Sequence, residues 1–269
     1  MATRERRTPR RTDALSRERI VEAAIELLDT AGEDGLTFRV LTERLSTGPG
    51  AIYWHVANKG ELLAAATEAV VGPVLTATPA DSAEPAGAAN PTEQAAPAAP
   101  AAPAAPAGST GPGAPSGDKE SAQDAIRAVA LGLFDAIDEH PWLALQLTTQ
   151  LSRSPWGSVT PRIFERLGQQ VCALGVPKNS WFMTTSALMH YILGAAGQNS
   201  ANARVLGPDA NRTEFLGETA KAWTELDPEN YPFTRAVADQ MRDHDDREQF
   251  LAGVNLVLAG ITSLHLPNQ

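Results

Sequence analysis

The sequence has little of several things that would mark other classes of protein. Its 269 residues contain one cysteine, Cys172, so no disulfide can form within the chain. No run of about 18 apolar residues occurs, and the start has no apolar stretch of the kind that secretory signals carry. Cys172 follows a helical pattern between apolar neighbours, so we expect a buried structural thiol. Together these absences predict a soluble, cytoplasmic protein with no membrane partner.

The chain also lacks an overall positive charge, because its formal net charge is −10 at pH 7. That charge is unevenly distributed. Residues 1–20 hold seven arginines and three acidic residues, a local charge of +4, whereas residues 118–269 hold 12 basic and 18 acidic residues. Association with DNA depends on the local field, so the total charge does not exclude it. We expect residues 1–15 to form a flexible basic arm along DNA phosphates, with a merely solubilising tail as the alternative.

Proline and alanine are concentrated in one segment. Nine of the 20 prolines and 15 alanines fall between residues 79 and 117, and Ala-Ala-Pro repeats four times over residues 95–106. Proline at every third position blocks a helix, and alanine offers too little apolar surface to offset the entropy of ordering. We therefore expect a disordered linker over residues 74–118, looped out so that the helices on either side still pack together. Weak coupling through a flexible tether is the alternative.

Apolar periodicity predicts four helices before this linker. A first helix of about 15 residues stops at Gly32, Thr37 and Thr47 are expected to cap the second and third helices, and Asn58 starts a fourth at Lys59. The expected helices cover about 17–31, 38–45, 48–56 and 59–71. Two short helices joined by a tight, glycine-containing turn and braced by a helix on each side are typical of a helix-turn-helix domain, here residues 16–73.

Residues 119–269 are also helical in pattern, and no alternating run suggests a strand. The six or seven expected helices cover about 121–139, 143–151, 161–174, 179–205, 212–225, 232–242 and 246–264. The fold class is therefore all-α, with an N-terminal helix-turn-helix domain and a larger helical domain. The histidines are scattered, and neither a metal-spaced pair nor a phosphate-binding loop occurs, so we expect no catalytic residue, metal or cofactor, and no enzyme.

Three large side chains are consecutive on the third expected helix, namely Tyr53, Trp54 and His55. Each residue of a helix advances the direction by about 100°, so the three cannot face one core and the aromatic rings must point outward. Packing against neighbouring helices is the alternative for any one of them. Their position after a turn and before the cationic Lys59 favours a phosphate-bearing partner, because a short helix fits the major groove.

These strings resemble a known family. Gly35-Leu36-Thr37-Phe38-Arg39 and Tyr53-Trp54-His55-Val56, followed by Asn58-Lys59, resemble the DNA-binding domain of TetR-family regulators, and especially the tetracycline-repressor branch. The resemblance covers about residues 16–72, and the last helix also resembles the dimer-forming helix of that branch. The residues that it implies at the DNA are Arg39, Thr47, Pro49, Gly50, Ala51, Tyr53, Trp54, His55 and Lys59.

The resemblance breaks at the start of the third helix. That branch carries Gln-Pro-Thr where this chain has Pro49-Gly50-Ala51, which offers no side-chain hydrogen bond to a base. Direct readout of base edges would therefore depend on Arg39 and on apolar contacts to thymine, and we expect a different operator sequence. Tetracycline is not expected as a ligand, because the linker replaces the histidine with which that branch binds the drug and its magnesium.

The resemblance implies a homodimeric transcriptional regulator, a repressor of the bacterial cytoplasm and nucleoid. It would bind a pseudo-palindromic operator in double-stranded DNA and leave it when an unknown small-molecule inducer binds. Two copies of helices 179–205 and 246–264 would form the dimer. The pocket would lie between the helices that start near residues 121, 143 and 179. Its candidate residues are Phe134, Trp142, Gln146, Trp181, His190 and Asn199. A non-switching, architectural DNA-binding dimer without a ligand is the alternative.

Overall fold

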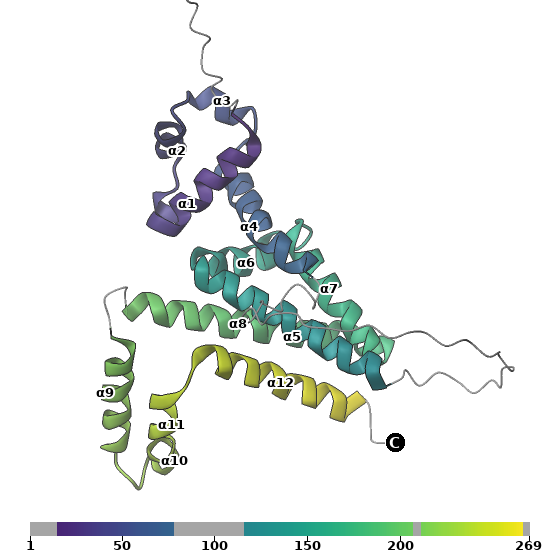
Figure 1. The fold of residues 1–269 in the computed structure, drawn as a ribbon, viewed down its shortest axis with the longest axis vertical. Coiled ribbons are helices and arrows are strands. Elements are labelled where there is room, and N and C mark those ends of the chain that lie inside the picture. The colour runs from purple at the N-terminus through teal and green to yellow at the C-terminus, as the bar shows by residue number, and fades with distance from the viewer. Residues whose placement is uncertain (1–14, 78–115, 207–210, 266–269) are drawn as a thin grey trace, which may run out of the picture.

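The computed structural model describes residues 15–77, 116–206 and 211–265, and most of them lie in helices (Figure 1). The helices are α1 (Arg17–Gly35), α2 (Phe38–Leu45), α3 (Pro49–Tyr53), α4 (Lys59–Thr76), α5 (Ser116–Glu139), α6 (Trp142–Arg153), α7 (Val159–Ala173), the short 3₁₀ helix η1 (Lys178–Ser180), α8 (Trp181–Leu206), α9 (Arg212–Thr224), α10 (Pro232–Ala236), α11 (Ala238–Asp243) and α12 (Asp246–His265). These ranges contain no strand, so the all-α prediction is confirmed. The expected linker over residues 78–115 and the arm up to residue 14 lie outside them.

Helices α1 to α4 form the small N-terminal domain. Fully buried side chains from each helix meet in its centre, among them Ile20, Leu41, Ile52 and Leu62. The helix α1 continues to Gly35, but its geometry breaks at Gly32, whose φ of 65° suits glycine, so the expected stop marks a real kink. The glycine that was expected to end the first helix therefore does change the direction of the chain at that position.

Helix α4 runs further than its sequence suggests and joins the two domains. It continues through Pro73 to Thr76, whereas the periodicity ends near residue 71. Its last turns pack on the larger domain: a Cβ on Gly132 of α5 would lie 2.6 Å from Val74 Cγ1, and Arg166 of α7 donates to the Ala77 carbonyl at 3.0 Å. Helices α4 and α5 thus pack directly, which is the contact that a looped-out linker requires.

The larger domain is a stack of long helices. Helix α8 packs on α5, α6 and α7, and α12 lies against α5 and α8 (Figure 1). Its core contains Leu133, Leu167 and Phe250, all nearly or fully buried. The rings of Phe134 and Phe250 pack together with their centres 4.7 Å apart. This packing places α12 at the end of the molecule opposite α2 and α3 (Figure 1).

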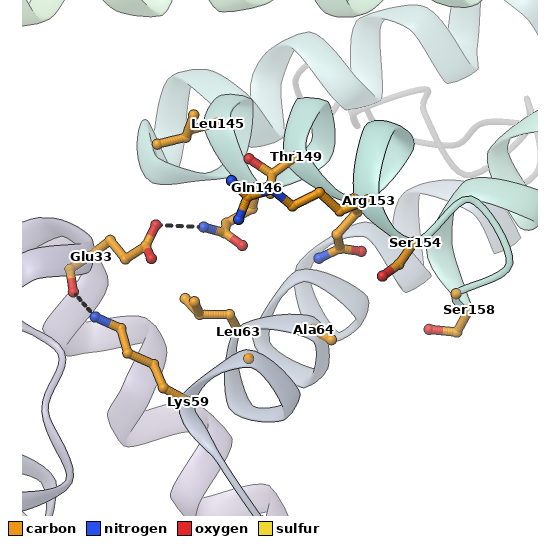
Figure 2. Close-up of a pocket in the computed structure, with 13 residues that line it drawn as sticks. Glu33, Lys59, Leu63, Ala64, Leu145, Gln146, Thr149, Arg153, Ser154 and Ser158 are labelled. Atoms are coloured by element: carbon orange, nitrogen blue, oxygen red, sulfur yellow. Dashed lines mark hydrogen bonds between the residues drawn. The ribbon is translucent and has the colours of Figure 1, made fainter.

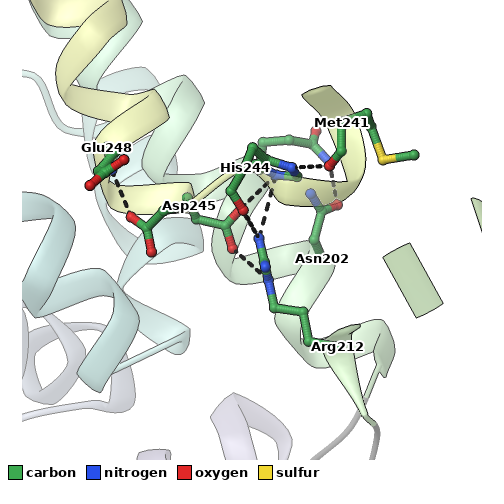
Figure 3. Close-up of polar contacts among 8 residues, drawn as sticks. Asn202, Arg212, Met241, His244, Asp245 and Glu248 are labelled. Carbon is green, nitrogen blue, oxygen red and sulfur yellow. Dashed lines mark hydrogen bonds and ion pairs between the residues drawn. The ribbon is translucent and has the colours of Figure 1, made fainter. Parts of the chain in front are cut away.

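Helices α9, α10 and α11 extend from the body between α8 and α12 (Figure 1). The single helix expected over 232–242 was wrong, because Val237 leaves helical geometry and separates α10 from α11. A polar junction ties this extension to the start of α12: Arg212 and His244 both contact the Asp246 carboxylate, with Arg212 at 2.8 Å and His244 at 3.0 Å (Figure 3). Asp245 caps α12 by accepting from the Glu248 amide at 2.8 Å (Figure 3).

The structure also bears on the single cysteine and on the expected absence of a membrane-spanning helix. Cys172 is exposed on α7, so the buried thiol was wrong. The buried positions of α7 are Val159, Ile163, Leu167 and Val171, a four-residue spacing that leaves position 172 about 100° to one side. Within residues 15–77, 116–206 and 211–265, no helix has both the length and the apolar character that crossing a membrane requires.

Candidate nucleic-acid interface

The turn between α2 and α3 sets the direction of the third helix. Ser46 adopts the left-handed conformation, with φ 50° and ψ 44°, and the Thr47 amide donates back to the Thr42 carbonyl at 3.1 Å. Gly48 is the N-cap of α3, and no side chain caps it, so the predicted capping role of Thr47 was wrong. Pro49 at the first helical position removes one amide that would have needed a partner.

Helix α3 is shorter than predicted, because it ends at Tyr53 rather than near Val56. The amides of His55 and Val56 both donate to the Ile52 carbonyl, at 2.9 and 3.0 Å, so the chain turns away after one and a half helical turns. Ile52 and Val56 are buried and anchor this segment. Tyr53 and Trp54 point outward as predicted, with 53% and 89% of their surface exposed.

The exposed aromatic side chains are not equally free. The Tyr53 ring stacks on Phe38 of α2, with ring centres 4.8 Å apart and planes 12° from parallel. This stack fixes the tyrosine ring and holds α3 against α2. Trp54 has no such partner ring among the described residues and presents its indole to the surface. Phe38 therefore supports the interface, a role that sequence reasoning missed because it depends on the angle between α2 and α3.

Arg39, the cation predicted to read a base edge, lies on the exposed face of α2. Its side chain is 87% exposed, and its Nε donates to Glu43 Oε1 at 3.1 Å one turn further along α2. The Thr37 hydroxyl caps the helix by accepting from the Val40 amide at 3.2 Å, as predicted. A solvent-exposed ion pair of this kind contributes little free energy, so the guanidinium can exchange Glu43 for a base edge.

Lys59, which was predicted to contact DNA, also has a partner within the chain. It is half-buried, and its ammonium donates to the Glu33 carbonyl at 2.6 Å, which ties the start of α4 to the end of α1 (Figure 2). The predicted capping box at this helix start is present. Asn58 Oδ1 accepts from the Glu61 amide at 2.9 Å, and Glu61 Oε2 accepts from the Ala57 amide at 2.9 Å. The role of Lys59 at a phosphate remains a prediction.

The structure brings most of the predicted DNA residues to one end of the molecule, along α2, α3 and the turn between them (Figure 1). Pro49 and Gly50 are exposed at the start of α3, while Thr47, Ala51 and His55 are half-buried beside it. A Cβ on Gly50 would meet no atom within 4 Å, so the backbone there is open to a close approach. These residues and Arg39 form a surface short enough to enter a major groove.

A row of polar contacts that the sequence did not reveal joins the small domain to the larger one. Asp29 Oδ1 contacts His140 Nδ1 at 2.8 Å and accepts from Trp142 Nε1 at 2.7 Å. Glu33 accepts from Gln146 Nε2 at 2.7 Å (Figure 2). These contacts fix the small domain relative to α6, so Trp142 and Gln146, predicted at a ligand, also hold the domains together.

Two of the six ligand candidates line hollows formed by described residues, and they line different ones, so the ligand-binding role of all six remains a prediction. Gln146 lines a hollow of about 630 Å³ between the domains, and Trp142 lines another of about 510 Å³ beside α1. Neither hollow includes the other four candidates. Phe134 packs in the core, His190 is exposed and Asn199 is half-buried on α8, and the Trp181 indole donates to the Val176 carbonyl at 2.7 Å.

Comparison with known proteins matches both domains. The family described as "Bacterial regulatory proteins, tetR family" matches residues 20–66, and the "Tetracyclin repressor-like, C-terminal domain" matches residues 114–264. The class C tetracycline repressor of Escherichia coli is 47% identical over 57 residues, which cover 21% of this chain and 26% of that protein. A transcriptional regulator of Saccharopolyspora erythraea is 43% identical over 60 residues, 22% of this chain and 25% of that protein. The aligned residues thus span about a quarter of these curated relatives.

Solved structures match along most of the chain. A TetR transcriptional regulator from Streptomyces coelicolor is 56% identical, with a TM-score of 0.71, and the match covers 93% of this chain and 99% of that one. ActR of Streptomyces coelicolor in complex with actinorhodin shares the fold at 19% identity, with a TM-score of 0.63 and coverage of 93% and 97%. Given the two domain matches and the full-length relative, the chain belongs to the TetR family of bacterial regulatory proteins.

Proposed function

We propose that the chain is a homodimeric, sequence-specific DNA-binding transcriptional repressor that a small-molecule inducer releases from its operator. The observation that carries this proposal is the exposed surface of α2 and α3, where Arg39, Tyr53 and Trp54 are presented together. This surface lies within residues 20–66, the segment that matches the tetR family of bacterial regulatory proteins. It would work by binding, and not by catalysis, in the bacterial cytoplasm at the nucleoid.

The far end of the molecule supports a dimer. Helix α12 buries Phe250, Val254 and Leu258 against its own chain, while Leu256 on the opposite side is 75% exposed and Leu264 in the last turn is 78% exposed. An exposed apolar row on a long helix is a surface that a second copy can cover. Two copies of α8 and α12 would then form a four-helix bundle. The dimer would place two copies of the α2–α3 surface, called the reading surface below, on one pseudo-palindromic operator.

The contacts between the domains support a switch. Helix α4 starts in the small N-terminal domain and ends packed on α5 and α7. A shift of α5 and α7 would therefore move the reading surface. An inducer releases the operator if it binds more tightly to the free form than to the DNA-bound form. Proteins of this fold include BioQ, solved with its DNA operator, and ActR, solved with actinorhodin.

The test is DNA binding by the full-length protein on the DNA that flanks its own coding region. Arg39→Ala should weaken operator binding by about 1–3 kcal/mol, roughly 5- to 150-fold, and should relax the preference at one position of each half-site. Arg242→Ala, on exposed α11 and away from α2 and α3, is the matched control and should leave binding unchanged. An equal loss on operator and on random DNA would show that Arg39 does not read sequence.

The same assay separates the switch from its alternative. Binding repeated with a broad panel of metabolites and antibiotics should identify a compound that releases the operator. If the protein stays on the operator throughout while its dimer forms normally, the non-switching architectural role is the better description. If no flanking DNA is bound at all, the proposed repressor function is wrong.

A further inference from the structure

The hollow between the two domains has features of a binding site, and Gln146 is the one predicted ligand residue among the described residues that line it. Its walls come from α1 and α4 on one side and from α6 and the turn into α7 on the other (Figure 2). Its volume of about 630 Å³ falls in the range that small organic ligands occupy. A molecule held there would touch both domains at once.

Of the charged side chains discussed at this hollow, Glu33 has hydrogen-bond partners and Arg153 has none among the described residues. Glu33 accepts from Gln146 through its carboxylate and from Lys59 through its carbonyl, so both its groups are engaged. Arg153 lies on the same lining, is exposed, and makes no hydrogen bond or ion pair with the described residues. Figure 2 shows its side chain running back along α6 toward Thr149 and Gln146. Within the described part of the chain, the lining therefore offers a guanidinium that no other side chain engages.

Further groups on the lining suit an organic anion. The Thr149 hydroxyl has no hydrogen bond among the described residues and can donate beside the guanidinium, whereas the Ser154 hydroxyl, also without one among them, lies further along the lining (Figure 2). The amide nitrogens of Gln146 and Gln150 already donate to Glu33 and to Thr67, so the donors left for an anion are the Arg153 guanidinium and the hydroxyls. Leu63, Ala64 and Leu145 supply an apolar wall. A guanidinium with a hydroxyl next to it and aliphatic carbon on the same lining can bind a carboxylate with an apolar body.

We propose that this interdomain hollow binds a small organic carboxylate, with its anionic group on Arg153 and Thr149 and its apolar body on Leu63, Ala64 and Leu145. Such a ligand connects α4 of the small N-terminal domain to α6 of the larger domain. Its binding therefore favours one orientation of the reading surface and, by linkage, changes affinity for DNA wherever DNA needs another. Only this regulatory consequence rests on the proposed repressor function, because the binding itself needs no operator.

The direct test is calorimetry on the full-length protein with benzoate and phenylacetate as probes and benzamide as the neutral counterpart of benzoate. We expect a carboxylate to bind and benzamide to bind much more weakly, because the amide lacks the charge that Arg153 would pair. Arg153→Gln should weaken carboxylate binding by about 10- to 100-fold, the effect of losing a charge-assisted hydrogen bond. Arg153→Lys should retain part of the affinity.

The matched control is Arg204→Gln, because Arg204 is also exposed and unpaired among the described residues but lines the adjoining hollow beside α1, which shares only Glu33 and Leu145 with this one. This variant should bind the carboxylates normally. Ala64→Phe, which fills the hollow without removing a polar group, should abolish binding, with thermal melting to verify the fold. The proposal is overturned if neither carboxylate binds at millimolar concentration, if benzamide binds equally well, or if Arg153→Gln leaves the affinity unchanged.

Discussion

Gly253 on α12 is where the structure leaves no room for a side chain. A Cβ at this position would lie 1.8 Å from the Tyr191 hydroxyl oxygen and 2.3 Å from the ring carbon that carries it. The tyrosine, on α8, donates its hydroxyl to the Phe250 carbonyl at 3.0 Å, and its ring stacks on Phe250 at 5.9 Å. Burial raises the pKa of Tyr191 above its ordinary value, so the neutral donor is the form present at neutral pH. Gly253→Ala must therefore displace Tyr191.

The size of the effect follows from what the displaced ring loses. The hydrogen bond is worth about 1 kcal/mol and the aromatic contact about 1 kcal/mol. Crowding of the core adds about 1–3 kcal/mol, and alanine's better helix propensity returns about 1 kcal/mol. We expect Gly253→Ala to lower the free energy of unfolding by about 2–4 kcal/mol. In a domain of this size, that corresponds to a fall of roughly 4–16 °C in the thermal midpoint.

The assay is thermal unfolding followed by circular dichroism at one fixed protein concentration, since dimerisation makes the midpoint depend on concentration. Gly217→Ala on α9 is the control, because a Cβ there would meet no atom within 4 Å and should stabilise by up to about 1 kcal/mol. In a Tyr191→Leu background, Gly253→Ala should cost much less than in the wild type. Equal effects of the two glycine substitutions, or full additivity in the double variant, would refute the close contact.

Three other changes test separate parts of the structure. Asp29→Ala removes the shared acceptor of two side chains from the larger domain, and should lower urea stability by about 1–2 kcal/mol and speed hydrogen exchange at the start of α6; unchanged exchange there would contradict the contact. Asp246→Ala frees Arg212, and should cost at most about 1 kcal/mol in this half-exposed pair while making residues 211–245 more sensitive to protease; equal sensitivity would count against the junction. Desolvation, and secondarily the Glu165 charge, raises the pKa of the exposed Cys172 thiol. Its alkylation should therefore be slower at neutral pH than that of a short cysteine peptide and should keep rising above the pH at which the peptide's rate levels off; coincident pH profiles would exclude the shift.

Local signals in the sequence predicted local features well. The glycine at position 32 marks a kink, and Thr37 and Asn58 each cap the helix that follows them. These features depend on hydrogen bonds over three or four residues, which composition and spacing determine. The outward direction of Tyr53 and Trp54 also followed from the helical repeat alone. Helix starts and exposed faces are therefore the part of this fold that a single sequence specifies.

Features that depend on packing between distant segments were missed. Thr47 has the right chemistry for a cap, but the left-handed Ser46 shifts the start of α3 by one residue, so Gly48 takes that position. The periodicity of α4 fades near residue 71, yet the helix continues because Gly132 of α5 lets Val74 approach closely. Cys172 has apolar neighbours, yet it lies outside the row of α7 that faces the core. In each case the deciding contact comes from another helix or from a turn.

The candidate ligand residues show the same limit and explain why the interdomain hollow escaped notice. Trp142 and Gln146 were predicted in a pocket between the helices that start near residues 121, 143 and 179, and both do lie next to hollows, but at the boundary with the small domain. The cation at that boundary is Arg153, one turn beyond Thr149 on the same helix, which no pattern in the sequence singled out. An arginine without a partner is recognisable only when the groups around it are known. The proposed role of Arg153 could therefore not be predicted from the sequence, because it depends on α4 and α6 lying side by side.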